Sequence, residues 1–261
     1  MTLRELLKRV AEGSMSIEEA EQQLRLLALE EIANVLKLDV GRELRKSVPE
    51  IIFSEHKSLN QLEQAIRVLL RVRGRAIASR LREDQLEVLK KFEQEYNVTL
   101  STSRRVAVVK RRDYKTIKSG GIVGIVTAGT ADVSIADEVK LITEELGCDA
   151  ITIYDVGVAG LHRTIDAAKK LLEEDVDVVV AIAGMEGALP SILASILDVP
   201  VIGLPTSIGY GLGGKGVTAL LCMLQSCSPG LLVVNIDNSV GAAVAAALIA
   251  NRVAKFRRMN K

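Results

Sequence analysis

The sequence predicts an α/β protein in which a doubly wound, three-layer parallel sheet follows a smaller helical and α/β region. Beyond residue 120, five apolar segments alternate with helical stretches of about a dozen residues, which is typical of parallel βαβ winding. The preceding segment, residues 97–121, is basic and ends in a glycine pair, which indicates a connector. We therefore expect an N-terminal region of residues 1–104 and a C-terminal α/β domain of residues 105–261.

The N-terminal region is predicted to begin with two helices that extend to about Leu38. Apolar residues recur there at helical spacing, and Ser16 with Glu19 has the pattern of a capping box. A small α/β region follows, and a further strand is expected within the connector. Its elements are expected at residues 49–55 and 75–81 for the strands and at residues 59–73 and 83–96 for the helices.

Each predicted strand of the C-terminal domain is a mostly apolar run, as expected for strands that are buried on both faces. The strands are expected at residues 121–129, 148–157, 176–184, 199–206 and 230–237. In such sheets the ligand lies outside the carboxyl ends of the strands, where loops and helix N-termini meet. The corresponding loops are 127–134, 155–163, 183–191, 205–216 and 236–243, and every one contains glycine.

Composition narrows the classes of function. The 261 residues carry a net charge of +1 and only 3% aromatic residues, which disfavours nucleic-acid partners. Three cysteines without C-x-x-C spacing and two histidines disfavour a disulfide framework or a zinc cluster. The N-terminus has the pattern of an amphipathic helix rather than a signal peptide, and the apolar runs fall short of a membrane span. We therefore expect a cytoplasmic protein without membrane partners.

The loop after the first C-terminal strand has the sequence TAGTADVS. Its backbone amides, assisted by Thr130 and Ser134, are candidates to bind a phosphate. Thr127, Gly129 and Asp132 are further candidate substrate contacts in the same loop. Hydroxyl and carboxylate residues are also the preferred helix caps, so the loop by itself indicates no more than a helix start.

The loop at residues 205–216 contains five glycines and Lys215. Because such a backbone can approach an anionic ligand closely, Gly209, Gly211 and Lys215 are candidate contacts with a phosphate or carboxylate. The segment is not a P-loop, because Gly216 follows the lysine where that motif has serine or threonine. A disordered surface loop is the alternative.

Two residues are candidates for acid–base and covalent chemistry. Glu186 directly follows a very apolar strand, where a buried carboxylate would suit proton transfer; a capping or ion-paired glutamate fits the pattern equally well. Cys227 precedes a Pro-Gly break, which is expected to place it near the mouth of the sheet, where a thiolate could act as a nucleophile. Cys148 and Cys222 are expected to be buried packing residues.

The remaining loops supply further candidate substrate contacts. They are Gly184, Met185, Asp155, His162, Arg163 and Lys57. His162 and Arg163 could bind phosphate, but capping of the following helix is the favoured interpretation. Lys57, beside His56 at the end of an N-terminal strand, could contact an anion, but charged loops of this kind are usually only solvated.

Six motifs together resemble the LarB family and, more distantly, the aminoimidazole ribonucleotide (AIR) carboxylases. They are TAGTAD, AGMEGALPS, PVIGLPTSIGYG, GGKGVTALL, MLQSC and NIDNSVGAA. The segment DVGRELRKSVPEIIFSEHKS extends the resemblance over most of the chain, with His56 where LarB proteins usually have glycine. AIR carboxylases typically have a histidine just before the Leu-Pro of the second motif, whereas this chain has Ala188 there and Glu186 two residues earlier. This difference favours LarB over purine carboxylation.

The resemblance implies a carboxylase and hydrolase in the first step of nickel-pincer cofactor biosynthesis for lactate racemase. Such an enzyme carboxylates nicotinic acid adenine dinucleotide at pyridinium carbon 5, using carbon dioxide or bicarbonate, and cleaves its phosphoanhydride. The products are pyridinium-3,5-biscarboxylic acid mononucleotide and AMP. Cys227 would add covalently to the ring, and Glu186 would remove the proton from carbon 5.

The resemblance also implies magnesium, no organic cofactor and a homo-octamer. The metal ligands stay open at this point, and Asp132, Asp155 and Asp237 are candidates for metal or ribose contacts. Two alternative hypotheses stay open as well. One is a purine-pathway AIR carboxylase or mutase with the same fold, and the other is a nucleotide-binding sensor without catalysis.

Overall fold

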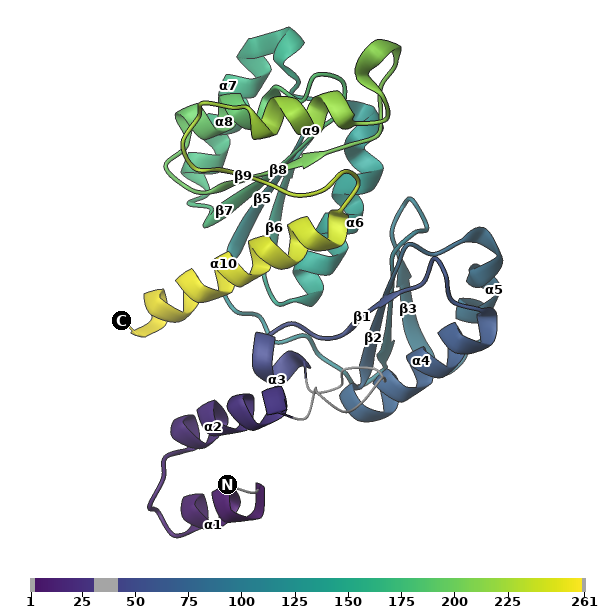
Figure 1. Ribbon diagram of the computed structural model, residues 1–261, viewed down its shortest axis with the longest axis vertical. Coiled ribbons are helices and arrows are strands. Elements are labelled where there is room, and N and C mark those ends of the chain that lie inside the picture. Colours follow the sequence, from purple (N-terminus) through teal and green to yellow (C-terminus); the bar gives the residue numbers. More distant parts are fainter. Residues whose placement is uncertain (1–2, 31–41, 260–261) are drawn as a thin grey trace.

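The computed structural model describes residues 3–30 and 42–259 and confirms the predicted α/β class. Figure 1 shows two sheets with their own helices, one above the other along the long axis of the molecule. The C-terminal sheet has five parallel strands in the order β6-β5-β7-β8-β9. These strands are β5 (Ile122–Thr127), β6 (Asp149–Ile153), β7 (Val178–Ala183), β8 (Val201–Pro205) and β9 (Leu231–Val233).

Helices cover both faces of this sheet, which gives the predicted three layers (Figure 1). One face carries α6 (Val133–Glu145) and α10 (Ser239–Met259). The other face carries α7 (Leu161–Glu173), α8 (Leu189–Ile196) and α9 (Val217–Leu224). All six residues of β7 are buried, because both faces of this strand meet helices. Since β6 and β7 flank β5 and the chain winds in opposite directions from it, the fold predicts a ligand crevice between the ends of β5 and β7.

The long helix α10 lies on the sheet through a face of small residues. Ala242, Ala246 and Ala250 recur every four residues and are fully buried. By length and composition alone, this helix is apolar enough to cross a membrane. Its alanine face instead forms part of the domain core, where the small side chains allow the helix to pack closely on the strands.

The N-terminal region contains a four-stranded sheet in the order β1-β2-β4-β3, in which β1 and β2 are parallel and the other pairs are antiparallel. Its strands are β1 (Ile51–Phe53), β2 (Arg75–Ser79), β3 (Tyr96–Leu100) and β4 (Ala107–Arg111). Its helices are α1 (Leu3–Ala11), α2 (Ile17–Glu30), α3 (Arg42–Lys46), α4 (Leu59–Arg73), the 3-10 turn η2 (Glu83–Gln85) and α5 (Leu86–Lys90). One face of the sheet packs against α4 and α5, and the other face joins the core of the C-terminal domain through Ile77 and Val108.

Most N-terminal elements lie where the sequence predicts them. The capping box is confirmed, since the Ser16 amide donates to Glu19 and the Glu19 amide donates to the Ser16 hydroxyl oxygen. The described part of α2 ends at Glu30, so the predicted helix up to Leu38 extends outside the described residues. The helix expected at residues 83–96 stops at Lys90, because the chain then turns into β3. Strand β4 pairs with β2 and β3, so the N-terminal sheet extends beyond the boundary expected at residue 104.

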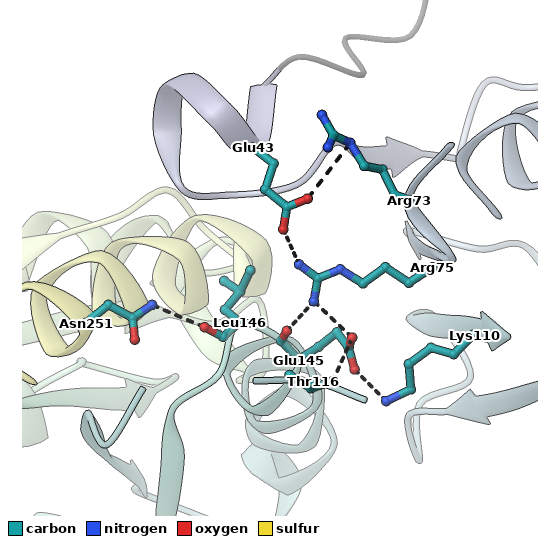
Figure 2. A network of polar contacts seen from close by, with 8 residues as sticks. All are labelled: Glu43, Arg73, Arg75, Lys110, Thr116, Glu145, Leu146 and Asn251. Atoms are coloured by element: carbon teal, nitrogen blue, oxygen red, sulfur yellow. Dashed lines mark hydrogen bonds and ion pairs between the residues drawn. The ribbon is translucent and has the colours of Figure 1, made fainter. Parts of the chain in front are cut away.

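A buried ion-pair network joins the two halves at the C-terminal end of α6. Figure 2 shows Arg75 between two glutamates: one Nη donates to Glu145 Oε1 at 3.0 Å and the other to Glu43 Oε1 at 2.6 Å. Lys110 and Thr116 also donate to the Glu145 carboxylate, at 2.8 and 3.1 Å. Only 7% of Arg75 and 4% of Glu145 is exposed, so both charges depend on these partners.

A second set of hydrogen bonds holds the other end of α6. In the turn between β3 and β4, the Thr102 amide and hydroxyl donate to Asp137 at 2.6 and 2.7 Å. The Ser103 hydroxyl donates to Glu138 at 2.6 Å, and the Ser239 hydroxyl at the start of α10 donates to the other oxygen of Glu138. The N-terminal sheet therefore contacts α6 at two places. These two sets of contacts fix the position of the N-terminal sheet on the C-terminal domain.

We predict that Arg75→Met lowers the free energy of unfolding by about 3–5 kcal/mol, because it leaves Glu145 buried without its main partner. The matched control is Arg104→Met, whose ion pair with Glu83 is largely exposed and whose loss should cost less than about 1 kcal/mol. Urea unfolding followed by circular dichroism measures both values. Equal losses in the two variants would show that the buried network does not hold the halves together.

Candidate active site

Two adjoining cavities of about 490 and 540 Å³ lie at the carboxyl ends of β5, β7 and β8. Both are lined by Met185, Glu186, Ile208, Gly209 and Tyr210. They therefore form one continuous depression, which we call the sheet-end cleft. Its position agrees with the crevice that the strand order predicts.

The two parts of the sheet-end cleft differ in chemistry. The part beside β5 and β7 is mostly apolar, with small side chains such as Ala131, Ala159 and Ala188 in its wall. The part beside β8 is formed by the backbone of the 205–216 loop and by Lys215. The first part suits a flat apolar ring, and the second suits an anionic group.

Close packing between two loops shapes the centre of the cleft. The Met185 amide donates to the Ile208 carbonyl at 3.1 Å, which ties the loop after β7 to the loop after β8. A Cβ atom on Gly184 would lie 2.1 Å from the same carbonyl oxygen, so only glycine fits there. Gly184 therefore has a packing role, and Met185 and Gly209 line the cleft as predicted contacts.

Glu186 lies at the junction of the two parts of the cleft, but it is exposed rather than buried. The expectation of a buried carboxylate is therefore wrong. The cause is local backbone geometry: Met185 and Gly187, on either side, both have positive φ, of 51° and 69°. This turn takes the chain out of the apolar sheet and presents Glu186 to the open cleft, where a bound substrate could reach it.

The 205–216 loop adopts a conformation that requires several of its glycines. Gly211, Gly214 and Gly216 have φ of 75°, 53° and 89°. Lys215, also at positive φ, is exposed and lines the cleft together with Gly209 and Gly211. The predicted contacts of this loop therefore come together in one cavity.

The TAGTAD loop contributes a buried carboxylate instead of a free phosphate-binding turn. Asp132 accepts hydrogen bonds from the Gly129 amide at 3.1 Å and from the Thr206 hydroxyl at 2.8 Å. The Gly129 amide is thus occupied by the protein itself. Gly129 and Asp132 line the cleft, whereas Thr130 is exposed at the start of the 3-10 turn η3 (Thr130–Asp132) and Ser134 lies in α6; neither lines the cleft.

The sequence interpretation missed Thr206, which is fully buried and anchors Asp132. A hydroxyl directly after the apolar strand β8 was the signal that could have identified it. Burial raises the pKa of Asp132, and the hydrogen bonds from Thr206 and Gly129 oppose this rise. Asp132 is thus a carboxyl group that lines the cleft and has a raised pKa.

Thr127, Asp155, His162 and Arg163 do not line the cleft. The Thr127 hydroxyl oxygen accepts the Asp155 amide at 3.1 Å, and Arg163 pairs with the Asp155 carboxylate at 2.8 Å. His162 is exposed in the first turn of α7. These contacts give Thr127, Asp155 and Arg163 a structural role in holding the loop after β6. Substrate binding by these residues and by His162 stays a prediction.

Asp237 links the cleft to the N-terminal region. Its carboxylate accepts the Ser207 amide at 2.9 Å, and its carbonyl accepts Arg80 Nη2 at 3.2 Å. Lys57 lies just beyond β1, and its carbonyl accepts a hydrogen bond from the Gln85 side chain at 2.8 Å. Lys57 does not line the sheet-end cleft, so its role as a substrate contact stays a prediction.

Cys227 does not lie near the mouth of the sheet, contrary to the sequence-based expectation. It follows α9 and leads into the amino end of β9, where the Gly230 carbonyl accepts the Val201 amide. Figure 1 shows this segment at the opposite end of the sheet from the 205–216 loop, because α9 runs back along the strands. Within one chain, Glu186 therefore lies at the carboxyl ends of the strands and Cys227 at their amino ends.

The other two cysteines fit their expected packing roles to different degrees. Cys148 is fully buried, and burial raises the pKa of its thiol to about 11. Its Sγ lies 3.2 Å from Asn251 Oδ1. Cys222 is half-buried on α9. Cys227 is exposed, which a nucleophile requires.

The described residues do not form a resident metal site. Among residues 3–30 and 42–259, no three His, Cys, Asp or Glu side chains cluster as metal ligands. The three carboxylates considered as ligands, Asp132, Asp155 and Asp237, each accept hydrogen bonds from the protein. These donors do not fit a magnesium ion held by the protein alone, and magnesium stays a prediction from the family resemblance.

Comparison with known families identifies the family of the chain. The AIR carboxylase model matches residues 122–259, and the LarB/PurE-like N-terminal domain model matches residues 29–111. The chain belongs to the AIR carboxylase family and carries a LarB/PurE-like N-terminal domain. This membership supports a carboxylase-type enzyme, and the two matches meet at the connector between β4 and β5.

Individual relatives of this LarB-type chain fall into two groups. An uncharacterized protein of Methanocaldococcus jannaschii is 43% identical over 95% of this chain and 96% of its own length. The N5-carboxyaminoimidazole ribonucleotide mutase of Pyrococcus horikoshii is 34% identical over 48% of this chain and 70% of its own length. The mutase of M. jannaschii is 33% identical over 47% of this chain and 74% of its own length. Similarity to the mutases is thus confined to about half of the chain.

We predict that Asp132→Asn makes the protein more stable near neutral pH. Because the folded-state pKa of Asp132 is raised, the folded protein holds this proton more tightly than the unfolded chain. Stability contributed by the group therefore falls as the pH rises from about 4 through the raised pKa, and the loss is complete above it. Thermal unfolding between pH 4 and 7 should show a smaller loss in the variant than in the wild type, whereas the exposed control Asp166→Asn should follow the wild type. Parallel curves for wild type and Asp132→Asn would contradict the assignment.

Proposed function

We propose that this protein carboxylates nicotinic acid adenine dinucleotide at pyridinium carbon 5 and cleaves the phosphoanhydride, releasing pyridinium-3,5-biscarboxylic acid mononucleotide and AMP. The observation that carries the proposal is the wall of the sheet-end cleft at Ala188. AIR carboxylases typically have a histidine at the position that Ala188 occupies in this family resemblance. A methyl group there leaves Glu186 as the nearby proton acceptor and leaves room for a flat ring.

The distribution of relatives supports a reaction distinct from that of the mutases. M. jannaschii has both a protein named as an N5-carboxyaminoimidazole ribonucleotide mutase and an uncharacterized protein that matches this chain over almost its full length. A second purine mutase in the same organism would be redundant. The full-length relative, which matches this chain in its N-terminal region as well, is therefore better explained by a different substrate.

The proposed chemistry needs one nucleophile and one base. A thiolate adds to a ring carbon of the pyridinium, and the displaced electron pair neutralises the ring nitrogen, which leaves an enamine. Carbon 5 of this enamine forms a bond to carbon dioxide. Glu186 then removes the proton from carbon 5, and the C–S electron pair returns to sulfur, which restores the aromatic ring and the free thiolate. The sum of these steps is replacement of a proton by a carboxylate, so no oxidant or reductant is needed, and the separate cleavage of the phosphoanhydride to the mononucleotide and AMP consumes one water molecule.

The nucleophile must come from a second copy of the chain if it is Cys227. Glu186 follows the carboxyl end of β7, whereas Cys227 precedes the amino end of β9 in the same sheet. One chain therefore cannot bring the two side chains to one substrate without refolding. This requirement is consistent with the homo-octamer that the family resemblance implies, and we propose that each site combines Glu186 of one protomer with Cys227 of another.

The anionic parts of the substrate need compensating charge. Lys215 and the backbone amides of the 205–216 loop are the cationic and donor groups of the cleft, so we assign the substrate carboxylates or phosphates to that side. We further propose that magnesium enters with the phosphates, because the described side chains do not form a complete metal site.

The proposal predicts that purified protein, given nicotinic acid adenine dinucleotide, bicarbonate and magnesium, releases AMP and a mononucleotide with one added carboxyl group. Mass spectrometry of the reaction mixture measures both products. Consumption of an aminoimidazole ribonucleotide instead would replace the proposal with a purine-pathway carboxylase or mutase. Tight binding of the dinucleotide without turnover would favour the sensor hypothesis.

A subunit-mixing experiment tests the shared site. Cys227→Ala and Glu186→Gln chains should each be inactive alone, whereas Cys222→Ala should be nearly as active as wild type. In a co-assembled mixture of the two inactive chains, about a quarter of the sites receive both intact residues if protomers combine at random. Carboxylation should then return to about that fraction of the wild-type rate. No recovery in a verified mixed oligomer would rule out a site shared in this way.

A further inference from the structure

A third cavity lies between the N-terminal region and the start of α10. Its volume is about 310 Å³, and residues from both halves of the chain line it. This volume is at the lower end of the range for small-molecule sites, about 300–1,000 Å³. We call it the interdomain cavity, because it exists only where the two halves meet.

Two arginines give the interdomain cavity affinity for an anion. Arg80 and Arg42 both line it. Arg80 Nη2 donates to the Asp237 carbonyl at 3.2 Å, and a guanidinium has five N–H donors, so this hydrogen bond uses one of them. Arg42 pairs with Glu50 at 3.1 Å, and Arg80 Nη1 lies 4.0 Å from Glu55. These glutamates are the acidic partners of the two arginines and reduce the net positive charge at the cavity.

The start of α10 forms another part of the cavity wall. Asn238 lines the cavity and caps the helix, because its Oδ1 accepts the Gly241 amide at 2.9 Å. Gly241 also lines the cavity, and a Cβ atom there would lie 2.4 Å from the Asn238 side chain. The positive end of this long helix thus opens on the same space as the two arginines.

Part of the cavity wall is apolar and includes an aromatic ring. Phe53 is 48% exposed and lines the cavity with Ile51 of the same strand and Val244 of α10. An exposed aromatic ring on a strand can stack on a planar base or present its edge to it. A cationic side and an aromatic side, facing the same cavity, match the phosphate and the base of a nucleotide.

Asp237 forms hydrogen bonds with one lining residue of the interdomain cavity and one of the sheet-end cleft. The carbonyl of this residue accepts Arg80 in the cavity, and its carboxylate accepts the amide of Ser207, which lines the cleft. Asp237 has a φ of 53°, and Arg80 has a φ of 51°, so both backbones hold strained conformations at this contact. A ligand that reached from one site to the other would pass this residue.

We infer that the interdomain cavity binds the adenylate half of the dinucleotide, with the phosphate toward Arg80 and the start of α10 and the base against Phe53. The inference rests on the proposed function, which places the pyridinium half in the sheet-end cleft. It explains why the chain has an N-terminal domain: the mutases, named for a single ribonucleotide, match only about half of the chain. A substrate with a second nucleotide half needs a second binding surface.

The test uses AMP alone as the probe and isothermal titration calorimetry on the full-length protein. Arg80→Met should weaken AMP binding at least about tenfold, because a charge-assisted contact to phosphate is lost. Arg104→Met is the matched control: Arg104 lies in the same region, has a φ of 58° and forms an exposed ion pair with Glu83. Its AMP affinity should stay within about twofold of wild type. No AMP binding by wild type, or equal losses in the two variants, would overturn the inference.

A second variant and a second ligand separate this inference from the proposed function. Phe53→Ala keeps Arg80 and Asp237 and should also weaken AMP binding, whereas nicotinic acid mononucleotide should bind all variants as it binds wild type. If the protein carboxylates the dinucleotide and Arg80→Met leaves its KM unchanged, the inference fails and the function stands. If no carboxylation occurs but Arg80→Met and Phe53→Ala both lose AMP, the proposed function fails and a nucleoside monophosphate site stands.

Discussion

The buried ion pair between Arg75 and Glu145 is the contact on which the relation between the two halves depends. Glu145 is in the last turn of α6, and α6 begins directly after the TAGTAD loop of the cleft. One end of this helix therefore adjoins the loop that lines the candidate active site, and the other end carries a docking contact of the N-terminal sheet. Because an unpaired charge in this buried position would be costly, the network allows one docking geometry and disfavours others. That geometry brings Arg80 to Asp237 and creates the interdomain cavity.

The sheet-end cleft shows how loops with little side-chain bulk can build a specific site. The loops after β7 and β8 are in direct backbone contact, which only glycine at position 184 permits. Asp132 is held below them by Thr206, in surroundings that raise its pKa. A buried carboxyl group of this kind reduces stability near neutral pH, and proteins keep such groups mainly where ligand binding or proton transfer uses them.

Because Glu186 and Cys227 are far apart within one chain, they can act on the same substrate only if two chains assemble. Both residues are exposed and both have a suitable chemical type, but one follows a strand end and the other precedes a strand start. In a parallel sheet, the carboxyl and amino ends of the strands are separated by the length of the strands. Under the proposed mechanism, covalent catalysis by this pair requires two copies of the chain, whereas the cleft and the interdomain cavity are each lined by residues of a single chain.

The sequence by itself determined the parallel C-terminal sheet, its helices and the loops that form the cleft, because continuous apolar runs and helical periodicity reflect local burial. It also singled out the glycines and Lys215 of the 205–216 loop, which the structure places along the cleft. It did not determine the exposure of Glu186, which depends on two positive φ angles, or the anchoring of Asp132 by Thr206, 74 residues away in the chain. The path of α9, which carries Cys227 to the far edge, and the contact of Arg80 with Asp237 likewise come from tertiary structure alone. Periodicity reports which face of an element is buried, whereas the meeting of distant side chains is decided by how the elements pack.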